Sequence, residues 1–238
     1  GGITGAGILR EAVRSGLRAL LLEAHDFASG TSSRSSKLVH GGLRYLQNGQ
    51  VGLTYASVRE RERLLREGRG LVSPLPFVMP NFSGDRIPGW VFWIGLTVYD
   101  LLAFKWNHAH YPAGGLRQLC PQLTAPALAS GYRFFDAETD DARLVLRLLR
   151  EACAEGGLCL NYAPVETLLR DAAGRVCGVK VADHSPLGGG RTVEVRARVV
   201  INATGAWADC LRRQVGGRGR LRILRGSHLF LPWNRLPL

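Results

Sequence analysis

The chain has 238 residues, 46% of them hydrophobic, which is enough to bury the core of one large domain or two small ones. Its formal net charge is +12, and a basic surface can attract nucleic acid. However, the arginines at 59–69 lie among glutamates, and those at 212–225 lack interleaved aromatic side chains on which bases could stack. We therefore expect no nucleic-acid partner. No apolar run reaches the roughly 18 residues of a membrane-spanning helix, and an odd count of five cysteines without a C-x-x-C pair indicates reduced thiols in a cytosolic compartment.

The first half of the chain predicts two helices around a strand and a polar loop. The opening GGITGAG leads into a predicted helix over 3–15, and the apolar run LRALLLE at 17–23 predicts a buried parallel strand. Residues 26–44 are polar and predict a loop, which a charged amphipathic helix at 51–68 follows. Four prolines between 74 and 88 oppose a regular helix there.

The rest of the chain predicts three further helical regions and a series of strands. Helices are predicted at 90–103 and at 141–155, the second capped by Thr139 or Asp140, with a short helix allowed in the connection at 116–133. Strand signals and their separating turns follow, at 159–162, 165–170, 176–181, 192–195, 199–202 and the strand-rich start 221–231. We therefore expect an α/β fold, with 17–23 and 199–205 in one mainly parallel sheet, helices on both faces and an antiparallel ribbon at 165–195.

The opening glycines resemble part of a dinucleotide-binding fingerprint, G-x-G-x-x-G. Gly2 and Gly5 match its second and third glycines, while the first glycine and its strand would precede Gly1, so we expect the chain to begin inside its own motif. Gly2 lets the backbone approach a pyrophosphate at the helix N-terminus, and Glu23 follows at about the distance of a ribose-binding acid. Leu9 departs from the small residue often found there, and a glycine turn beside a surface glutamate is the alternative interpretation.

Two other segments carry candidate cofactor contacts. GTSSRSSKLVHGGLRYL at 30–46 offers hydroxyl groups that can surround phosphates, then glycines that let the backbone pass a flat ring, then an arginine and a tyrosine. VVINATGAW at 199–207 predicts a buried strand that ends in a turn of small residues, which suits backbone contact with a nucleotide. A capped serine-rich loop and an ordinary strand with a tight turn are the alternatives.

Together these segments resemble the FAD-dependent glycerol-3-phosphate dehydrogenases, which are quinone-linked enzymes of glycerol catabolism. The resemblance is carried by LLLEAHDFASGTSSRSSKLVHGGLRYL, by DDARLVL at 140–146, by NATGAW and by RGSH at 225–228, and it runs through the whole chain. It implies a Rossmann-like FAD-binding domain of the glutathione-reductase or D-amino-acid-oxidase type, with inserted helices and the start of an antiparallel substrate-binding sheet. The implied domains are 1–72 with 134–215 for FAD, without its first strand, an inserted helical and proline-rich segment at 73–133, and the start of a truncated substrate domain at 216–238.

The resemblance also assigns residues to the cofactor and the substrate. The implied FAD contacts are Gly2, Gly5, Glu23, Thr31, Ser32, Ser33, Leu38, His40, Gly41, Gly42, Val165, Ala203, Thr204 and Gly205. The implied substrate residues are Arg44, Tyr45 and His228, and His228 would take the proton of the C2 hydroxyl; a structural histidine at a strand edge is the alternative there. His108 and His110 form an H-x-H pair without a further ligand cluster, so we expect no metal site.

The implied reaction is oxidation of sn-glycerol 3-phosphate to dihydroxyacetone phosphate by hydride transfer to FAD, with electrons passed to quinone. Alternatives are an oxidase that uses oxygen, a non-catalytic FAD-binding fragment, and an amino-acid oxidase of the same superfamily, against which the motif at 30–46 argues. We expect an internal fragment that is inactive alone. For the full-length protein we expect peripheral attachment to the cytoplasmic face of the inner membrane, through the basic surface and the Trp90 and Trp93 segment, and allow a homodimer. Packing of that segment inside the protein is the alternative, because tryptophan is highly buried on average.

Overall fold

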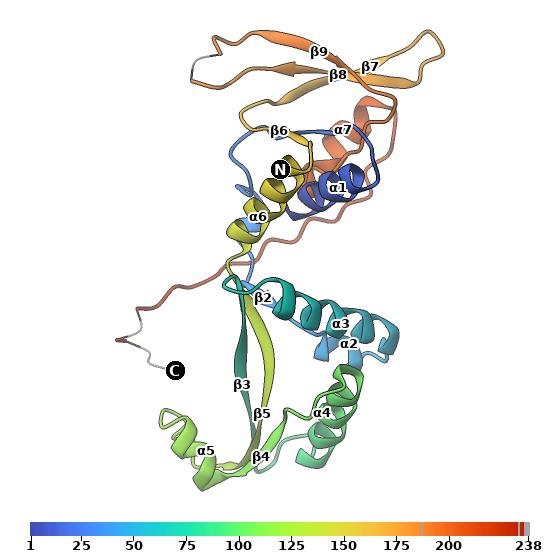
Figure 1. Ribbon diagram of the computed structural model, residues 1–238. Coiled ribbons are helices and arrows are strands. Elements are labelled where there is room, and N and C mark those ends of the chain that lie inside the picture. The colour runs from blue at the N-terminus through green and yellow to red at the C-terminus, as the bar shows by residue number, and fades with distance from the viewer. Residues whose placement is uncertain (187, 233, 236–238) are drawn as a thin grey trace. The chain divides into compact units, whose positions relative to one another are not determined.

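The structure is a computed structural model that describes residues 1–186, 188–232 and 234–235 (Figure 1). Its helices are α1 (Ile3–Arg14), α2 (Leu43–Gln47), α3 (Val51–Glu67), α4 (Gly89–Ala103), α5 (Ala113–Leu119), α6 (Asp141–Ala154) and α7 (Ala208–Gln214), with 3-10 turns η1 (Thr31–Ser33) and η2 (Gly205–Trp207). Its strands are β1 (Leu20–Leu22), β2 (Leu38–Val39), β3 (Val72–Phe82), β4 (Ala109–Pro112), β5 (Leu128–Thr139), β6 (Leu158–Leu160), β7 (Val165–Arg170), β8 (Val176–Ala182) and β9 (Thr192–Arg196).

The chain divides into two units, which are described separately below. The first unit combines residues 1–36 with 140–227, and the second combines 37–139 with the described residues of 228–238. The domains predicted from the sequence are defined by what they bind, FAD or substrate, whereas these two units are defined by how the chain packs. The predicted domain division therefore stays a prediction. No helix in the described parts of either unit is long and apolar enough to span a membrane.

Helices α1 and α6 and the strand pair β1–β6 form the core of the first unit. β1 and β6 are parallel, with Leu21 opposite Cys159. Apolar residues of α6 recur at a spacing of three or four, so one face of the helix buries Val145 and Leu149 against α1. The side chain of Asp140 accepts a hydrogen bond from the backbone N–H of Arg143 at 3.1 Å, which confirms the predicted cap of this helix.

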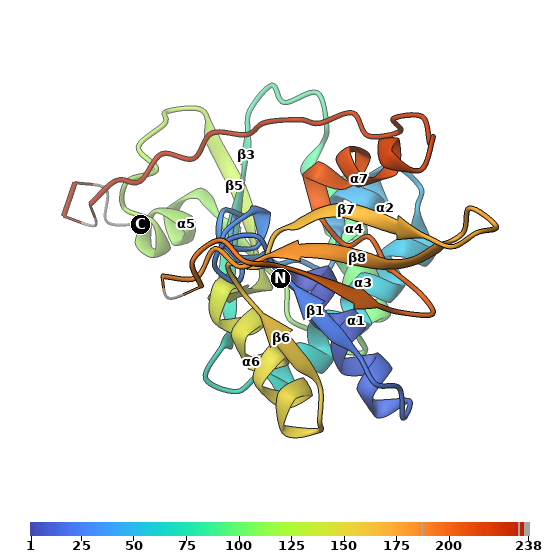
Figure 2. The same cartoon turned by 90° about the horizontal axis from the view of Figure 1, so that it is seen from above.

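An antiparallel ribbon of β7, β8 and β9 completes the sheets of the first unit and confirms the prediction for 165–195. Figure 2 shows its three strands side by side. Val179 and Val181 of β8 are buried on one face together with Ala163. The outer edge of β7 is covered by Gln214 of α7, whose side chain accepts a hydrogen bond from Leu168 N–H and donates one to the Glu166 carbonyl. Leu187, part of a predicted turn, lies outside the described residues.

The second unit is built on β5, which pairs with β2 and β4 along one edge and with β3 along the other. β3 and β5 remain paired from Val72–Thr139 to Phe82–Leu128 although β3 contains Pro74, Pro76 and Pro80. Prolines at even spacing place their missing N–H groups on one side of a strand, and β3 is an edge strand, so that side can face away from β5. Helices α3 and α4 cover the unit and bury Val58 and Tyr99 between them.

Two strand predictions are wrong. Residues 199–202 form no strand, and Val199 and Ile201 are 72% and 60% exposed, because no described strand pairs with this segment. The expected single parallel sheet is therefore limited to β1 and β6. Residues 221–231 also contain no helix or strand and are exposed throughout, since they too lack a partner strand, so the start of a substrate-binding sheet is not observed there.

Candidate functional site

The N-terminus of α1 meets the serine-rich loop at Gly2. A Cβ on Gly2 would lie 2.9 Å from Ser32 Oγ, so only glycine leaves this approach free. Ser32 Oγ accepts a hydrogen bond from the Ile3 N–H at 2.9 Å. The first bond within the helix runs from Ala6 N–H to the Gly2 carbonyl, so the N–H groups of Thr4 and Gly5 precede the ladder and remain available to a ligand. Together with the positive end of the helix dipole, they favour an anion here.

Gly5 brings three segments of the first unit together. A Cβ at this position would lie 3.2 Å from Leu21 Cδ1 of β1 and 3.7 Å from the Ala203 Cβ. The helix therefore packs closely on the strand, as predicted for the third glycine of the fingerprint. The serine-rich loop also contacts this turn, because a Cβ on Gly30 would lie 3.2 Å from Cζ3 of Trp207. The turn at 203–207 thus adjoins both the helix N-terminus and the loop.

Glu23 follows β1 and holds its carboxylate at the start of the chain. Its side chain accepts a hydrogen bond from the His25 N–H at 2.9 Å. A carboxylate at this position can accept further hydrogen bonds, as binding of ribose hydroxyls would require.

The serine-rich loop is anchored by Asp141, which the sequence did not single out as a site residue. Its carboxylate accepts a hydrogen bond from Ser35 Oγ at 2.8 Å and lies 3.3 Å from the Ser35 N–H. Upstream, Ala28 is buried with a left-handed φ of 61°, which is a strained conformation for a residue other than glycine. The conformation of the loop that carries Thr31, Ser32 and Ser33 is thus fixed at both ends. The sequence signal that could have identified Asp141 is its place as an acidic residue at the first position of a capped helix.

The turn after residue 202 is held by side-chain hydrogen bonds. Asn202 Oδ1 accepts a bond from Thr204 Oγ1 at 2.7 Å, and Asn202 Nδ2 donates to the Ala208 carbonyl at 2.8 Å. Gly205 has a φ of 58°, which glycine adopts without strain. Val165, at the start of β7, is half-buried against the ribbon core. The structure therefore brings Gly2, Gly5, Ser32 and Ala203 together in the first unit.

The remaining predicted residues belong to the second unit, where Gly41 lies against buried side chains. A Cβ on Gly41 would lie 2.1 Å from Tyr99 Oη and 2.9 Å from Val58 Cγ2. The Gly41 N–H donates to Asp136 Oδ1 at 2.9 Å, and Arg61 Nη1 donates to the same oxygen at 2.7 Å. Sequence reasoning missed Arg61, Tyr99 and Asp136. The available signal was a charged residue on the apolar face of α3, since Arg61 lies three residues after Val58.

Gly42 then begins α2, which carries Arg44 and Tyr45. Gly42 has a φ of 80°, and its carbonyl accepts a hydrogen bond from the Tyr45 N–H at 2.8 Å. The Arg44 side chain is exposed, and the rings of His40 and Tyr45 lie edge to face at 5.8 Å. Leu38 lies in β2, opposite Glu138 of β5.

His228 lies in an exposed segment without helix or strand, and its role stays a prediction.

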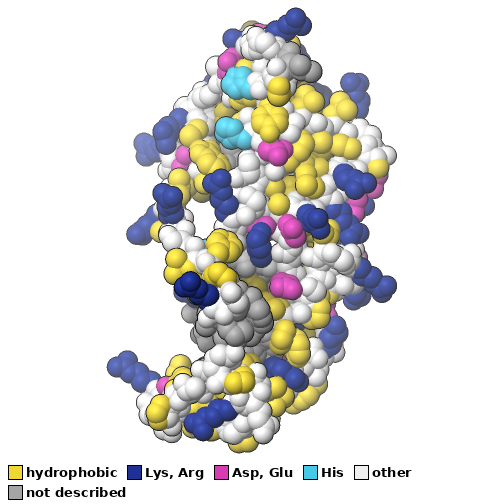
Figure 3. Space-filling view, turned by 90° about the vertical axis from the view of Figure 1, so that its left-hand side faces the viewer, with side chains coloured by type: hydrophobic (Ala, Val, Ile, Leu, Met, Phe, Trp, Pro, Cys, Tyr) yellow, Lys and Arg dark blue, Asp and Glu magenta, His cyan; other side chains and the backbone are white. Residues whose placement is uncertain are grey.

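In the described parts of the chain, no three His, Cys, Asp or Glu side chains gather as metal ligands would. The face in Figure 3 shows Lys and Arg side chains scattered rather than gathered in one stripe.

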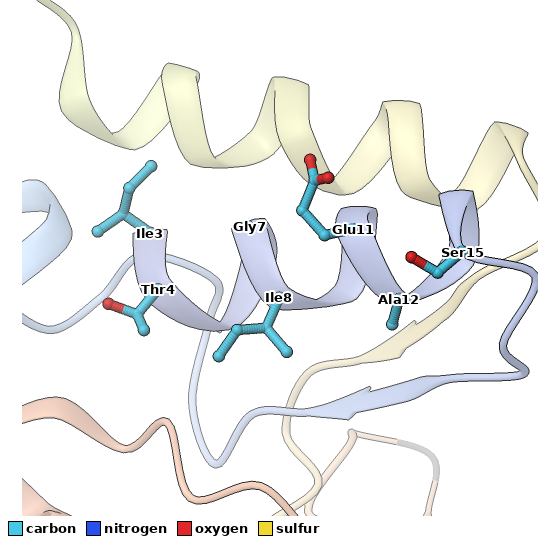
Figure 4. A pocket seen from close by; sticks show the side chains of 7 residues that line it. All are labelled: Ile3, Thr4, Gly7, Ile8, Glu11, Ala12 and Ser15. Atoms are coloured by element: carbon cyan, nitrogen blue, oxygen red, sulfur yellow. The ribbon is translucent and has the colours of Figure 1, made fainter. Parts of the chain in front are cut away.

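A hollow of about 520 Å³ runs along another face of α1 (Figure 4). It is lined by Ile3, Thr4, Gly7, Ile8, Glu11, Ala12 and Ser15. None of these is a predicted site residue, and the lining contains a single charged side chain. The candidate site is therefore the junction at Gly2 and Ser32 rather than this hollow.

The residues of the first unit fit the adenine dinucleotide part of FAD. This ligand requires a glycine that leaves room for a pyrophosphate, a helix N-terminus with N–H groups ahead of its ladder, and an acid after β1, and all three are present. In the second unit, Tyr99 and Val58 fill the space beside Gly41, and Tyr45 fills the space beside Gly42, so passage of a flat ring at 41–42 stays a prediction.

The chain matches the family of FAD dependent oxidoreductases over residues 1–238. It is 38% identical over 242 residues to the glycerol-3-phosphate dehydrogenase of Mycobacterium leprae (strain TN). This match covers 99% of this chain and 40% of that protein. It is 35% identical over 243 residues to the aerobic glycerol-3-phosphate dehydrogenase of Staphylococcus epidermidis (strain ATCC 12228 / FDA PCI 1200), covering 100% of this chain and 43% of the relative. The chain thus spans about two fifths of the length of these curated relatives.

Solved structures agree with this match and confirm the predicted FAD-binding α/β fold. The glycerol-3-phosphate dehydrogenase from Bacillus halodurans complexed with FAD is similar with a TM-score of 0.69 and 32% identity, over 90% of this chain and 34% of that one. The L-alpha-glycerophosphate oxidase from Mycoplasma pneumoniae with FAD bound has a TM-score of 0.65 at 14% identity, over 90% of this chain and 54% of that one, which shows the fold alone. A family match over the whole chain, on a fold shared with FAD-bound proteins, shows that this chain belongs to the FAD-dependent oxidoreductases.

Proposed function

We propose that the protein oxidises sn-glycerol 3-phosphate to dihydroxyacetone phosphate, with a quinone as the final electron acceptor. The carrying observation is the dinucleotide-binding junction at Gly2, Gly5 and Ser32, in a chain 32% to 38% identical over nearly all its length to proteins named glycerol-3-phosphate dehydrogenase. When bound, FAD supplies the redox chemistry by accepting a hydride at its flavin.

The residues of the first unit would hold the cofactor. The helix N-terminus at Gly2 and Gly5 would bind the pyrophosphate, and Glu23 would accept hydrogen bonds from the adenine ribose. The hydroxyl groups at 31–33 would surround the flavin half, and the backbone of Val165 would contact adenine. Ala203, Thr204 and Gly205 would line the nucleotide beside them. The close approaches measured among these segments support this assignment.

The residues of the second unit would act on the flavin side and on the substrate. Leu38, His40 and the two following glycines would pass the flavin ring. Arg44 is exposed at the start of a short helix, and a guanidinium there can hold the substrate phosphate or polarise an oxygen with paired hydrogen bonds. Tyr45 would add a hydroxyl group beside it, and His228 would take the proton from the C2 hydroxyl.

The test is anaerobic mixing of the FAD-loaded, full-length protein with glycerol 3-phosphate while flavin absorbance is followed. Bleaching by glycerol 3-phosphate but not by glycerol supports the proposal, and a flavin that stays oxidised contradicts it. We expect Arg44→Ala to lower kcat/KM at least tenfold, equivalent to about 1.4 kcal/mol, because it removes a substrate contact. Arg59→Ala, an exposed arginine of α3 beside Tyr55, is the matched control and should leave kcat/KM unchanged.

The electron acceptor is tested in the same preparation. Turnover with a soluble quinone should exceed turnover with oxygen, and hydrogen peroxide should not accumulate. Stoichiometric peroxide without quinone reduction would instead identify a glycerol-3-phosphate oxidase. Either outcome leaves the first part of the proposal, reduction of the flavin by glycerol 3-phosphate, unaffected.

We further propose that the full-length protein binds the cytoplasmic face of the inner membrane through α4 and the residues that follow it. Trp90, Trp93, Phe104 and Trp106 are between 46% and 84% exposed. The amphipathic indole rings of the tryptophans and the apolar ring of Phe104 suit a lipid interface. A double substitution, Trp90→Ser with Trp93→Ser, should reduce sedimentation with vesicles of anionic phospholipid, whereas Leu158→Ser, which removes an exposed apolar residue elsewhere, should not. Wild-type protein that stays in the supernatant at low salt would contradict the proposal.

A further inference from the structure

A buried polar cluster in the second unit joins three elements that lie far apart in the sequence. Arg61 of α3, Tyr99 of α4 and Asp136 of β5 are 4%, 1% and 7% exposed. Oδ1 of Asp136 accepts hydrogen bonds from Tyr99 Oη at 2.7 Å and from Arg61 Nη1 at 2.7 Å. The same oxygen accepts a third bond from the Gly41 N–H at 2.9 Å. One carboxylate oxygen therefore connects two buried side chains to the backbone of the glycine pair.

The cluster is more than a way to stabilise the unit. A buried ion pair recovers little net stability, because the cost of removing both charges from water is comparable to their attraction. Arg61 is well satisfied nevertheless: it also donates to the Phe135 carbonyl at 3.1 Å and to Glu62 Oε1 at 3.1 Å. Burial raises the pKa of Tyr99, so its hydroxyl stays protonated and donates to Asp136. The consequence specific to this arrangement is a fixed position for Gly41.

The position of Gly41 controls where α2 begins. Its Cα approaches Tyr99 so closely that an added Cβ would lie 2.1 Å from the hydroxyl oxygen. The next residue, Gly42, turns the chain with a φ of 80°, and its carbonyl accepts the Tyr45 N–H, which starts the helix. Thr54 Oγ1 lies 3.4 Å from the same carbonyl. Arg44 lies two residues after this turn, so a shift of Gly41 moves Arg44 with it.

We propose that Asp136, held by Arg61 and Tyr99, is a positioning residue that fixes the backbone of Gly41 and thereby aims Arg44 at the substrate. The kinetic part rests on the function proposed above for Arg44. The anchoring part concerns only the contacts of the second unit. The two parts are therefore tested by separate measurements.

The kinetic test is a double-mutant cycle in the full-length, FAD-loaded protein. Asp136→Asn keeps the shape of the side chain and removes its charge, so we expect at least a tenfold loss of kcat/KM with the FAD content unchanged. Because Asp136 acts through Arg44, the double variant Asp136→Asn with Arg44→Ala should be no worse than Arg44→Ala alone. Glu138→Gln, an exposed carboxylate of the same strand, is the matched control and should keep wild-type kinetics.

The anchoring test is amide hydrogen exchange of the peptide that contains residues 40–46, which needs no turnover. Exchange at Gly41 should be at least tenfold faster in Asp136→Asn than in wild type or Glu138→Gln. If Asp136→Asn does not fold, Tyr99→Phe is used in its place, because this substitution removes one hydroxyl group and keeps the ion pair between Arg61 and Asp136. Tyr99→Phe should change exchange at Gly41 and kcat/KM in the same directions but by smaller factors. Its loss of kcat/KM should again not add to that of Arg44→Ala.

Three results would overturn the inference: a folded Asp136→Asn with unchanged kcat/KM, losses that add to those of Arg44→Ala, or unchanged exchange at Gly41. A wild-type protein whose flavin is not reduced by glycerol 3-phosphate would overturn the proposed function instead. In that case the role assigned to Arg44 falls with it, and the exchange result alone supports or overturns the anchoring of Gly41.

Discussion

Replacing Gly41 with alanine should destabilise the second unit by a predictable amount. The new methyl group would lie 2.1 Å from Tyr99 Oη, 2.8 Å from its Cζ and 2.9 Å from Val58 Cγ2. Both neighbours are fully buried between packed helices, so neither can move away without disturbing the core. Inserting a methylene-sized group into such a site typically costs about 1–3 kcal/mol. For 150–250 residues that corresponds to a fall in Tm of about 2–12 °C, and the fall should be smaller in the longer full-length protein.

The assay is thermal unfolding of the full-length protein with and without added FAD. Gly95→Ala is the matched control, because Gly95 lies inside α4 and an added Cβ would have nothing within 4 Å. That substitution should stabilise the protein by about 0.5–1 kcal/mol, since alanine favours a helix over glycine. Adding Tyr99→Phe to Gly41→Ala removes the nearest clashing atom, so the pair should lose less stability than the sum of the two. A Gly41→Ala protein with the Tm of wild type would refute the steric argument.

Three further predictions concern other parts of the chain. Ser32→Ala removes the acceptor of the Ile3 N–H and should weaken FAD binding about fivefold, or about 1 kcal/mol, in a flavin fluorescence titration. Asp140→Ala removes the cap of α6 and should cost about 1 kcal/mol in urea unfolding, whereas an unchanged midpoint would contradict the capping role. Burial and the hydrogen bond with Cys153 raise the pKa of Cys159 to about 11, so iodoacetamide at pH 8 should modify the exposed Cys153 first, and the rate at Cys159 should rise with pH towards that value.

Much of the fold could be predicted because its signals are local. Helices α1, α3, α4 and α6 were predicted to within a few residues, since each shows apolar spacing, a capping residue or a terminal glycine. The ribbon of β7, β8 and β9 was predicted from short strands of branched residues separated by turns. In these segments the residues that decide the structure lie within a few positions of one another.

The long pair of β3 and β5 was not predicted, and its signals are not local. β3 contains three prolines, which oppose a strand unless it lies at a sheet edge, and only its partner some fifty residues later defines that edge. Arg61 and Asp136 were missed for the same reason. Each lies among other charged residues, and only folding brings them within 2.7 Å of each other. The glycine pair at 41–42 was predicted as a site, but what holds it in place depends on tertiary contacts.

The segment at 199–202 shows that the tendency of a sequence to form a strand differs from the strand itself. Its apolar residues predicted a buried strand, yet a strand needs a neighbour with which to exchange hydrogen bonds, and no described strand provides one. Val200 nevertheless packs against the core of the ribbon, and Ala203 lies next to Gly5. The turn that follows is fixed by the side chain of Asn202, which bonds to both Thr204 and Ala208. The candidate nucleotide contact is therefore positioned by packing and by one amide side chain, which explains how the turn keeps its place although the strand before it is unpaired.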